Sequence, residues 1–177
     1  MVYVLLADGF EEVEAVEPID ILLRGGVLVK TVGIKSKKVT GAHNITVEAD
    51  MLLDDVVFEN MELLMLPGGP GHTNIEKSEK AMNIIRAAYD KNIYISAICA
   101  SPSILGKMGL LENKTATCFP GYEKYLKGAE VSDKKAVKDG KIITGKGAGA
   151  AADFGFMMLK ELRGAETAEK IRSAMQY

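Results

Sequence analysis

The stretch IYISAICASPS, residues 93–103, decides the fold of this chain. Its first residues form an apolar run that is typical of a buried strand. Pro102 suits the first position of a helix, where no backbone N–H is needed, and we expect Ser101 to cap the free N–H groups of that helix. The strand would therefore end at Cys99 and turn at once into a helix, which places the thiol near the positive end of a helix dipole.

Two interpretations of Cys99 follow from this position. The dipole of a helix N-terminus favours the thiolate, which is the form that attacks carbonyls or peroxide. A free cysteine on an apolar strand is more often a small core residue. The elbow between strand and helix favours the reactive interpretation for Cys99. Cys118 has no such setting, and we expect it to be structural.

The bulk composition predicts one globular domain over residues 1–177. With 47% hydrophobic and 26% charged residues, the chain is neither disordered nor of low complexity. A formal net charge of −2 gives no electrostatic reason to expect a nucleic-acid partner. The two cysteines, the lack of a long apolar stretch and the lack of a signal-peptide pattern predict a cytoplasmic protein that does not act at a membrane.

Short apolar runs alternate with segments of helical periodicity, which predicts an α/β fold with a mostly parallel central sheet. The expected strands are residues 2–7, 27–34, 63–66, 93–98 and 141–144. The expected helices are residues 11–24, 78–91, 150–162 and 165–175, the second of them capped by Ser78.

Two local details complete this prediction. The first helix is expected to turn one stripe of side chains inward, formed by Val13, Val16, Asp20 and Leu23. The dipeptide Asp139–Gly140 predicts a hairpin with a type I′ turn, which needs two residues of positive φ.

Ligands of open α/β sheets bind beyond the carboxyl ends of the strands, so we expect functional side chains in the loops that follow the strands. The loop after the first strand carries Glu11, Glu12 and Glu14. The first two are explained as favourable acids in the first turn of a helix. Glu14 borders the predicted buried face, and a half-buried carboxyl near a thiol is expected to have a raised pKa and can act as a general acid or base.

The sequence PGGPG at residues 67–71 follows the third predicted strand. Its glycine pair, Gly68 and Gly69, would let backbone N–H groups approach a ligand closely, as an anion pocket requires, although a plain tight turn explains the pair equally well. The loop lacks the Gly-Lys-Ser/Thr ending of a phosphate-binding loop. His72 comes next and is expected to be a surface residue.

No cofactor or metal is expected. Residues 145–150, GKGAGA, only superficially resemble a dinucleotide fingerprint, because no strand with a terminal acid follows them. Close packing beside the following helix explains these glycines better. The two histidines, His43 and His72, form no Cys/His cluster with metal-ligand spacing.

Taken in order, four motifs resemble the ThiJ/PfpI superfamily, and specifically its branch of Parkinson-disease-protein (DJ-one-like) deglycases. The motifs are EEVE at 11–14, LPGG at 66–69, AICASP at 97–102, and GKGAG at 145–149 with Asp153 and Phe154 after it. The resemblance spans essentially the whole chain. It implies a flavodoxin-like three-layer sandwich that forms a homodimer.

The resemblance also implies a site. Cys99 would be nucleophilic and oxidisable, and a protonated Glu14 would be hydrogen-bonded to it. The backbone N–H groups of Gly69 and Ala100, beside Gly68, would form the anion pocket.

Two departures from the family pattern limit the comparison. Protease-like members carry a histidine directly after the cysteine, where this chain has Ala100, so a PfpI-type peptidase is the least favoured function. Many members carry another histidine where this chain has Phe119. If a second polar group reaches the pocket, we expect it to be His43 of the partner subunit, since residues 41–44 fall where the family dimerises.

The leading interpretation is a cofactor-independent enzyme of the glyoxalase or deglycase type, a hydro-lyase or hydrolase. It would act on small reactive aldehydes such as methylglyoxal, or on their glycated adducts, through the Cys99 thiolate with Glu14 as proton shuttle. The alternative is an oxidative-stress sensor or chaperone-like protein that signals through oxidation of Cys99 and turns over no substrate. Both interpretations use the same site, so the sequence does not separate them.

Overall fold

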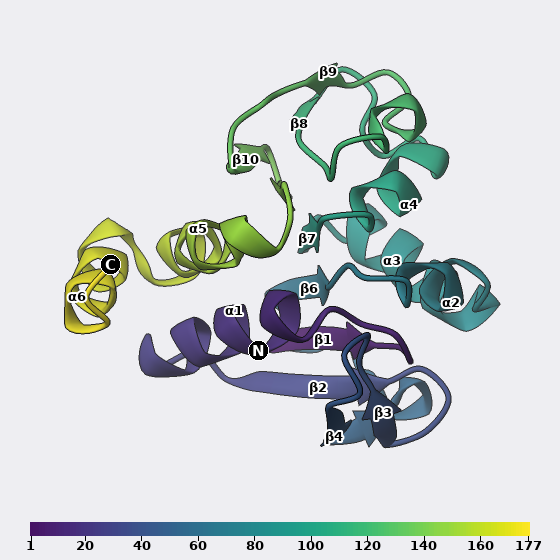
Figure 1. Cartoon of the computed structure of the whole chain (residues 1–177), viewed down its shortest axis with the longest axis horizontal. Coiled ribbons are helices and arrows are strands. Elements are labelled where there is room, and N and C mark those ends of the chain that lie inside the picture. The colour runs from purple at the N-terminus through teal and green to yellow at the C-terminus, as the bar shows by residue number, and fades with distance from the viewer.

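A seven-stranded sheet forms the centre of the protein in the computed structural model, which describes residues 1–177 (Figure 1). Its order is β10-β11-β7-β6-β1-β2-β5, and every neighbouring pair is parallel except β10 with β11. The strands are β1 Val2–Leu6, β2 Val29–Gly33, β5 Met51–Leu52, β6 Leu63–Leu66, β7 Tyr94–Ile98, β10 Ala136–Asp139 and β11 Ile142–Gly145. The predicted α/β fold with a mostly parallel central sheet is confirmed.

Helices cover both faces of this sheet and make a three-layer sandwich (Figure 1). One layer holds α1 Glu12–Arg24, α5 Ala151–Arg163 and α6 Ala165–Ala174, and the other holds α2 His72–Glu76, α3 Glu79–Asp90 and α4 Pro102–Lys107. Neighbouring side chains of β1 point to opposite faces, so Tyr3 and Leu5 join one core while Val4 joins the other. Every residue of β1 is buried for this reason.

Smaller elements lie at the margins of the sandwich. The hairpin of β3 Lys38–Thr40 and β4 Thr46–Glu48 lies below β2 in the view of Figure 1. The parallel pair β8 Thr115–Ala116 and β9 Glu130–Val131 lies above β10 in the same view. Three short 3-10 helices complete the chain, at Leu53–Asp55, Glu123–Tyr125 and Ala148–Ala150.

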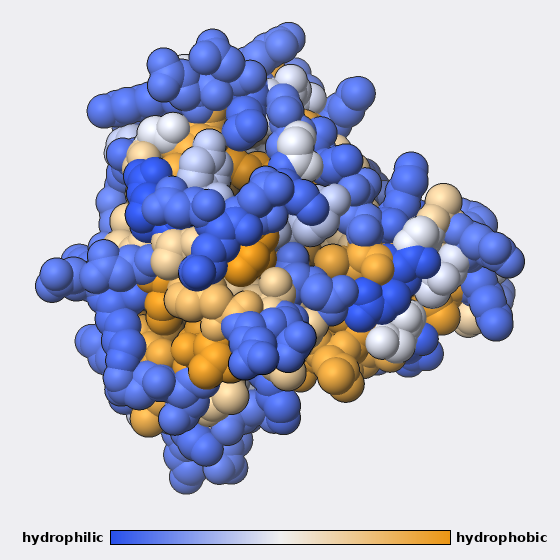
Figure 2. Space-filling view, turned by 180° about the vertical axis from the view of Figure 1, so that it is seen from behind, coloured by the Kyte–Doolittle hydropathy of each residue, from blue (hydrophilic) through white to orange (hydrophobic).

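The predicted inward stripe of α1 is wrong. Val13, Val16 and Leu23 are 42%, 51% and 52% exposed, and the helix buries a face that includes Glu14 and Pro18 instead. The prediction failed because the buried face contains a glutamate and a proline, whereas the exposed face is apolar and has the periodicity of a core stripe. Seen from behind, hydrophobic residues gather in patches on a mostly hydrophilic surface (Figure 2).

Two further local predictions have different outcomes. The hairpin of β10 and β11 is present, but only Gly140 of its turn has a positive φ, 58°, so the predicted type I′ turn is wrong. Asp139 is instead the last residue of β10, where it pairs with Ile142. The predicted cap of the second helix is confirmed, because the Ser78 hydroxyl accepts the Ala81 N–H. No helix has the length and apolar character that crossing a membrane requires.

Candidate active site

Cys99 occupies a strained elbow between β7 and α4. Its φ is 64°, in the left-handed region that non-glycine residues rarely adopt. Two backbone hydrogen bonds hold this conformation: the Cys99 N–H donates to the Gly145 carbonyl at 2.9 Å, and the Cys99 carbonyl accepts the Phe119 N–H at 2.8 Å. A backbone strained in this way costs about 1–3 kcal/mol and is found most often at functional sites.

Ser101 supports the elbow in a way that the sequence did not indicate. The predicted helix cap is wrong, because Ser101 has helical φ and ψ of −65° and −26° rather than the extended backbone of a capping residue. Its buried hydroxyl donates to the carbonyl of Pro67. This hydrogen bond ties the cysteine elbow to the loop that carries Gly68 and Gly69.

Glu14 enters the site from the first turn of α1. Its side chain is only 1% exposed, and Oε2 accepts the Gly68 N–H at 3.0 Å. Burial, together with the negative charge of Glu11, raises the pKa of Glu14 to about 7, although hydrogen bonds from Cys99 and Gly68 act in the opposite direction. The carboxyl is therefore poised to gain or lose a proton near neutral pH.

The thiol of Cys99 lies against this carboxyl. Burial and the negative charge of Glu14 raise the pKa of Cys99 to about 12. Hydrogen bonds from the N–H groups of Gly69 and Ala100 favour the thiolate and lower the pKa. The net direction is opposite to the one that the helix dipole alone predicts, because the dipole is weaker than burial next to a carboxylate.

The two groups therefore titrate as a pair that holds one negative charge in the neutral range. When the proton is on Glu14, the charge repulsion disappears and the carboxyl can donate to the sulfur of Cys99. When the proton is on the sulfur, the carboxylate can act as a base. This arrangement can make a nucleophile without a histidine.

The glycine loop approaches the pair too closely for any side chain. A Cβ at Gly68 would lie 2.5 Å from the Cβ of Cys99. Gly69 has a φ of 78°, and a Cβ there would lie 2.6 Å from the N atom of Glu11 and from the carbonyl oxygen of Gly9. Gly68 therefore brings bare backbone up to Cys99, and Gly69 packs against the loop before α1, which is more than a plain tight turn requires.

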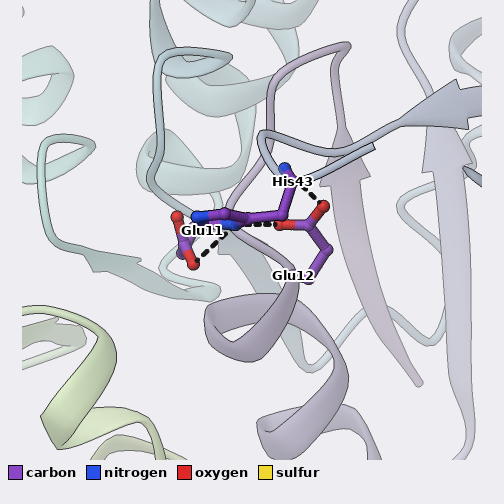
Figure 3. Close-up of side chains that lie close together, drawn as sticks. All are labelled: Glu11, Glu12 and His43. Carbon is purple, nitrogen blue, oxygen red and sulfur yellow. Dashed lines mark hydrogen bonds and ion pairs between the residues drawn. The ribbon is translucent and has the colours of Figure 1, made fainter. Parts of the chain in front are cut away.

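Glu12 and His43 form a second polar cluster, which the sequence did not indicate. The backbone N–H of His43 donates to Glu12 Oε1 at 2.8 Å, and its ring Nδ1 lies 2.9 Å from Oε2. Figure 3 shows the imidazole ring between the carboxylates of Glu12 and Glu11, the latter 3.5 Å from Nδ1. The hydrogen bond to Glu12 and the two negative charges raise the pKa of His43.

Glu12 is thus the anchor of the β3–β4 hairpin rather than an ordinary first-turn acid. Together Glu11, Glu12 and His43 offer donor atoms within 4.8 Å of one another, which is the grouping that a metal ion would need. Both oxygens of Glu12 already accept hydrogen bonds, so the ion pair accounts for the cluster without a metal. The contribution of His43 of the partner subunit stays a prediction.

The prediction that His72 is a surface residue is wrong, because its side chain is only 6% exposed. Its Nδ1 donates to the Gly69 carbonyl at 2.9 Å, and its ring forms a T-shaped pair with the ring of Tyr122 at a centroid distance of 5.5 Å. His72 therefore stabilises the glycine loop through the Gly69 carbonyl, a role that no local sequence pattern indicates. Cys118 is 3% exposed, and burial raises its pKa to about 11.

The loop after β11 also borders the site. As the sequence predicted, Gly145 packs closely beside α5, since a Cβ there would lie 3.0 Å from the ring of Phe154. A Cβ at Gly147 would lie 4.0 Å from Glu14 Oε1 and 3.2 Å from the ring of Phe119. Gly147 therefore lies beside Glu14, and the ring of Phe119 lies against Gly147.

A mostly parallel sheet with a cysteine at a strand-to-helix elbow, next to a buried glutamate, defines a class of three-layer α/β proteins. Residues 1–161 match the DJ-1/PfpI family, and the chain belongs to that family. It is 31% identical over 176 residues to protein dj-1beta of Drosophila melanogaster, and the aligned residues cover 97% of this chain and 94% of the relative. It is also 31% identical over 147 residues to a Pyrococcus abyssi protein named a deglycase, with 82% and 89% of the chains covered.

Solved structures agree with these sequence relatives. The crystal structure of Drosophila melanogaster DJ-1beta has a TM-score of 0.94 and 30% identity, covering 99% of this chain and 96% of that one. The structure of oxidized Toxoplasma gondii DJ-1 has a TM-score of 0.94 and 29% identity, covering 99% and 97%. The fold is therefore shared with these structures along 99% of the chain.

Proposed function

We propose that this protein is a cofactor-independent enzyme of the glyoxalase or deglycase type, acting on small reactive carbonyls or on their glycated adducts. The observation that carries the proposal is the contact between Cys99 and the buried Glu14, whose pKa lies at about 7. An acid–base group works best when its pKa is near the working pH. The archaeal relative that is named a deglycase supports the same class of substrate.

The reaction would begin with attack of the Cys99 sulfur on the aldehyde carbon of methylglyoxal, while Glu14 takes up the thiol proton. A carbon–sulfur bond forms and the carbonyl oxygen becomes an oxyanion. The N–H groups of Gly69 and Ala100, which favour the thiolate in the free protein, would then stabilise this oxyanion. Proton transfer from Glu14 completes the hemithioacetal.

Glu14 would next remove the proton from the carbon bonded to sulfur and deliver a proton to the neighbouring carbon. The hydroxyl proton of the hemithioacetal passes to the ketone oxygen in the same step. The ketone thereby becomes a hydroxyl group and the hemithioacetal carbon becomes a thioester. Water then hydrolyses the thioester, releasing a 2-hydroxy acid and the free thiol of Cys99. Methylglyoxal and one water give lactate, so the reaction needs no external oxidant or reductant.

We also propose that the protein acts as a homodimer. The exposed apolar side chains of Val13, Val16 and Leu23 lie along one face of α1, with the exposed Leu28 just beyond its end. This face supports the proposal, because protein–protein interfaces are among the sites that exposed apolar patches mark.

Turnover of methylglyoxal tests the proposed function. We expect the wild type to form lactate and both Cys99→Ser and Glu14→Gln to lose at least about 100-fold in rate, since each removes a group that the reaction needs. Cys118→Ala is the matched control, because it deletes the other thiol, and it should keep the wild-type rate. Equal rates in all four proteins would refute the mechanism.

A second candidate function is supported by a separate observation: the related Toxoplasma gondii structure is described as oxidized. In this candidate, peroxide oxidises Cys99 to a sulfinate, and the protonated Glu14 donates to one of its oxygens. Intact mass and peptide mapping after mild peroxide test this. Oxygen gained at Cys118 and not at Cys99 would refute the sensor.

A further inference from the structure

The strand β10 forms one edge of the sheet, and its outer side has no strand partner (Figure 1). The backbone N–H of Lys146 donates to the Lys135 carbonyl at 2.9 Å, which sets the alternation of hydrogen bonds between β10 and β11. In this alternation Val137 is hydrogen-bonded to β11, whereas the backbone N–H and C=O groups of Ala136 and Lys138 point away from it. These outward groups therefore have no partner in the sheet.

A groove with a volume of about 780 Å³ lies beside this edge, between β10 and the helices α5 and α6. Its floor is apolar and includes Phe156 and Ala168, which are buried beneath it, and the half-buried Met157. Ala136 and Lys138 line the same groove. Its volume is in the range of established ligand sites, roughly 300–1,000 Å³. The unpaired edge of β10 thus borders a space that is large enough for a ligand.

The groove carries an excess of positive charge, because five cationic and three acidic side chains line it. Two of the acids are already paired, one with Lys135 at 3.2 Å and one with Lys138 at 3.0 Å. Lys134 and Lys160 are exposed, and neither belongs to an ion pair. Lysines on an edge strand discourage pairing with the same edge of a second copy, and the same charges attract an acidic strand.

We propose that an extended acidic segment of a partner protein binds this groove by adding a strand to β10. The backbone of the segment exchanges hydrogen bonds with Ala136 and Lys138, as in other complexes formed by strand addition. Its side chains on the side of α5 and α6 lie on the apolar floor, and its acidic side chains pair with Lys134 and Lys160. Cys99 does not line the groove, so the proposal does not depend on the proposed enzymatic function.

Fluorescence anisotropy tests the proposal with a short labelled peptide in which glutamate and valine alternate. We expect this peptide to bind the wild type, and a matched peptide with lysine in place of glutamate not to bind. The double variant Lys134→Glu, Lys160→Glu should weaken binding of the acidic peptide at least about tenfold, because it reverses two charges that have no other partner. Lys77→Glu, which reverses an exposed lysine at the end of α2, is the control and should bind like the wild type.

Two results would overturn the proposal at this stage. One is equal binding of the acidic and the basic peptide, or binding of neither. The other is binding of dodecanoate, lost in the double variant, without binding of the acidic peptide, because the groove would then hold a small organic anion rather than a strand.

A second measurement tests strand addition separately from charge. Ala136→Pro removes an N–H that β11 does not use, so the variant should fold, as urea denaturation checks, and should lose the acidic peptide. Two N-methylated forms of the peptide make the same test without changing the protein. Each is methylated at every second residue, one at the odd and one at the even positions, so each lacks the backbone donors of one side only. We expect one form to bind and the other to fail, and equal affinities of the two forms would refute strand addition whether or not Ala136→Pro folds.

Discussion

Replacing Glu14 by glutamine should stabilise the protein at neutral pH while it removes the proposed activity. The pKa of Glu14 is about 7 in the folded protein, against an ordinary value of 4.5. Between these values the unfolded chain binds fewer protons than the folded one, so the stability of the wild type falls as the pH rises through this window. Glutamine keeps the size of the side chain and can still accept the Gly68 N–H, but it carries no charge.

The size of the effect follows from the two pKa values. At about 1.4 kcal/mol for each pKa unit, ionising the buried carboxyl costs about 3 kcal/mol by pH 8. Less than about 1 kcal/mol of this cost is present at pH 5, where Glu14 is protonated in the folded protein. The stability advantage of Glu14→Gln should therefore grow by about 2.5 kcal/mol between these two pH values.

Urea denaturation of both proteins at several pH values and one protein concentration measures this difference. Titrating groups that do not contact Glu14 are the same in both proteins and cancel in the comparison. Glu169→Gln, on the exposed side of α6, is the matched control for the loss of one glutamate. An advantage of Glu14→Gln that does not change with pH would refute the assignment of a neutral buried carboxyl.

Three further substitutions test the supports of the site. Gly68→Ala should lower the free energy of unfolding by about 3 kcal/mol and abolish activity, because its Cβ would lie 2.5 Å from the Cβ of Cys99. Gly149→Ala is the control and should change the free energy of unfolding little, since no atom lies within 4 Å of a Cβ there. Equal free energies of unfolding for the two variants would contradict this prediction. Ser101→Ala should cost about 1–3 kcal/mol by leaving a buried carbonyl without its donor, and an unchanged urea midpoint would argue against that role. Glu12→Gln should lower the pKa of His43 toward 6.5, as followed by NMR titration, and no change would show that the ion pair is absent in solution.

Most of the sheet could be predicted from the sequence because buried parallel strands are short, continuous apolar runs. The runs at β1, β6 and β7 are bounded by charged or turn residues, and they lie where we expected them. The strands β5 and β8 have two residues each, too few for any periodicity to be recognised.

The prediction of the inward face of α1 was wrong, and the physical reason also bears on function. The helix buries Glu14 and Pro18 and exposes Val13 and Val16, which is the reverse of an ordinary amphipathic pattern. A buried acid is the feature that a hydrophobicity pattern is least able to reveal. It is also the feature on which the proposed chemistry depends.

The pairing of Cys99 with Glu14 could be anticipated because both follow strands that end at the same edge of the sheet. The roles of Glu12, His43 and His72 could not. Glu12 and His43 meet across 31 positions of the chain, and neither residue has a local pattern that requires the other. Such contacts are set by tertiary packing alone.

The central claim is that Cys99 and Glu14 act as one unit, and the pH dependence of Cys99 alkylation tests it most directly. In the wild type we expect the rate to rise with a half-point near the pKa of Glu14, about 7, because loss of that first proton leaves a carboxylate that can accept the thiol proton and so form the thiolate. In Glu14→Gln that half-point should disappear, and the rate should rise only above about pH 8.5, the ordinary pKa of a cysteine. The same profile in both proteins, with a half-point near 8.5, would contradict the claim.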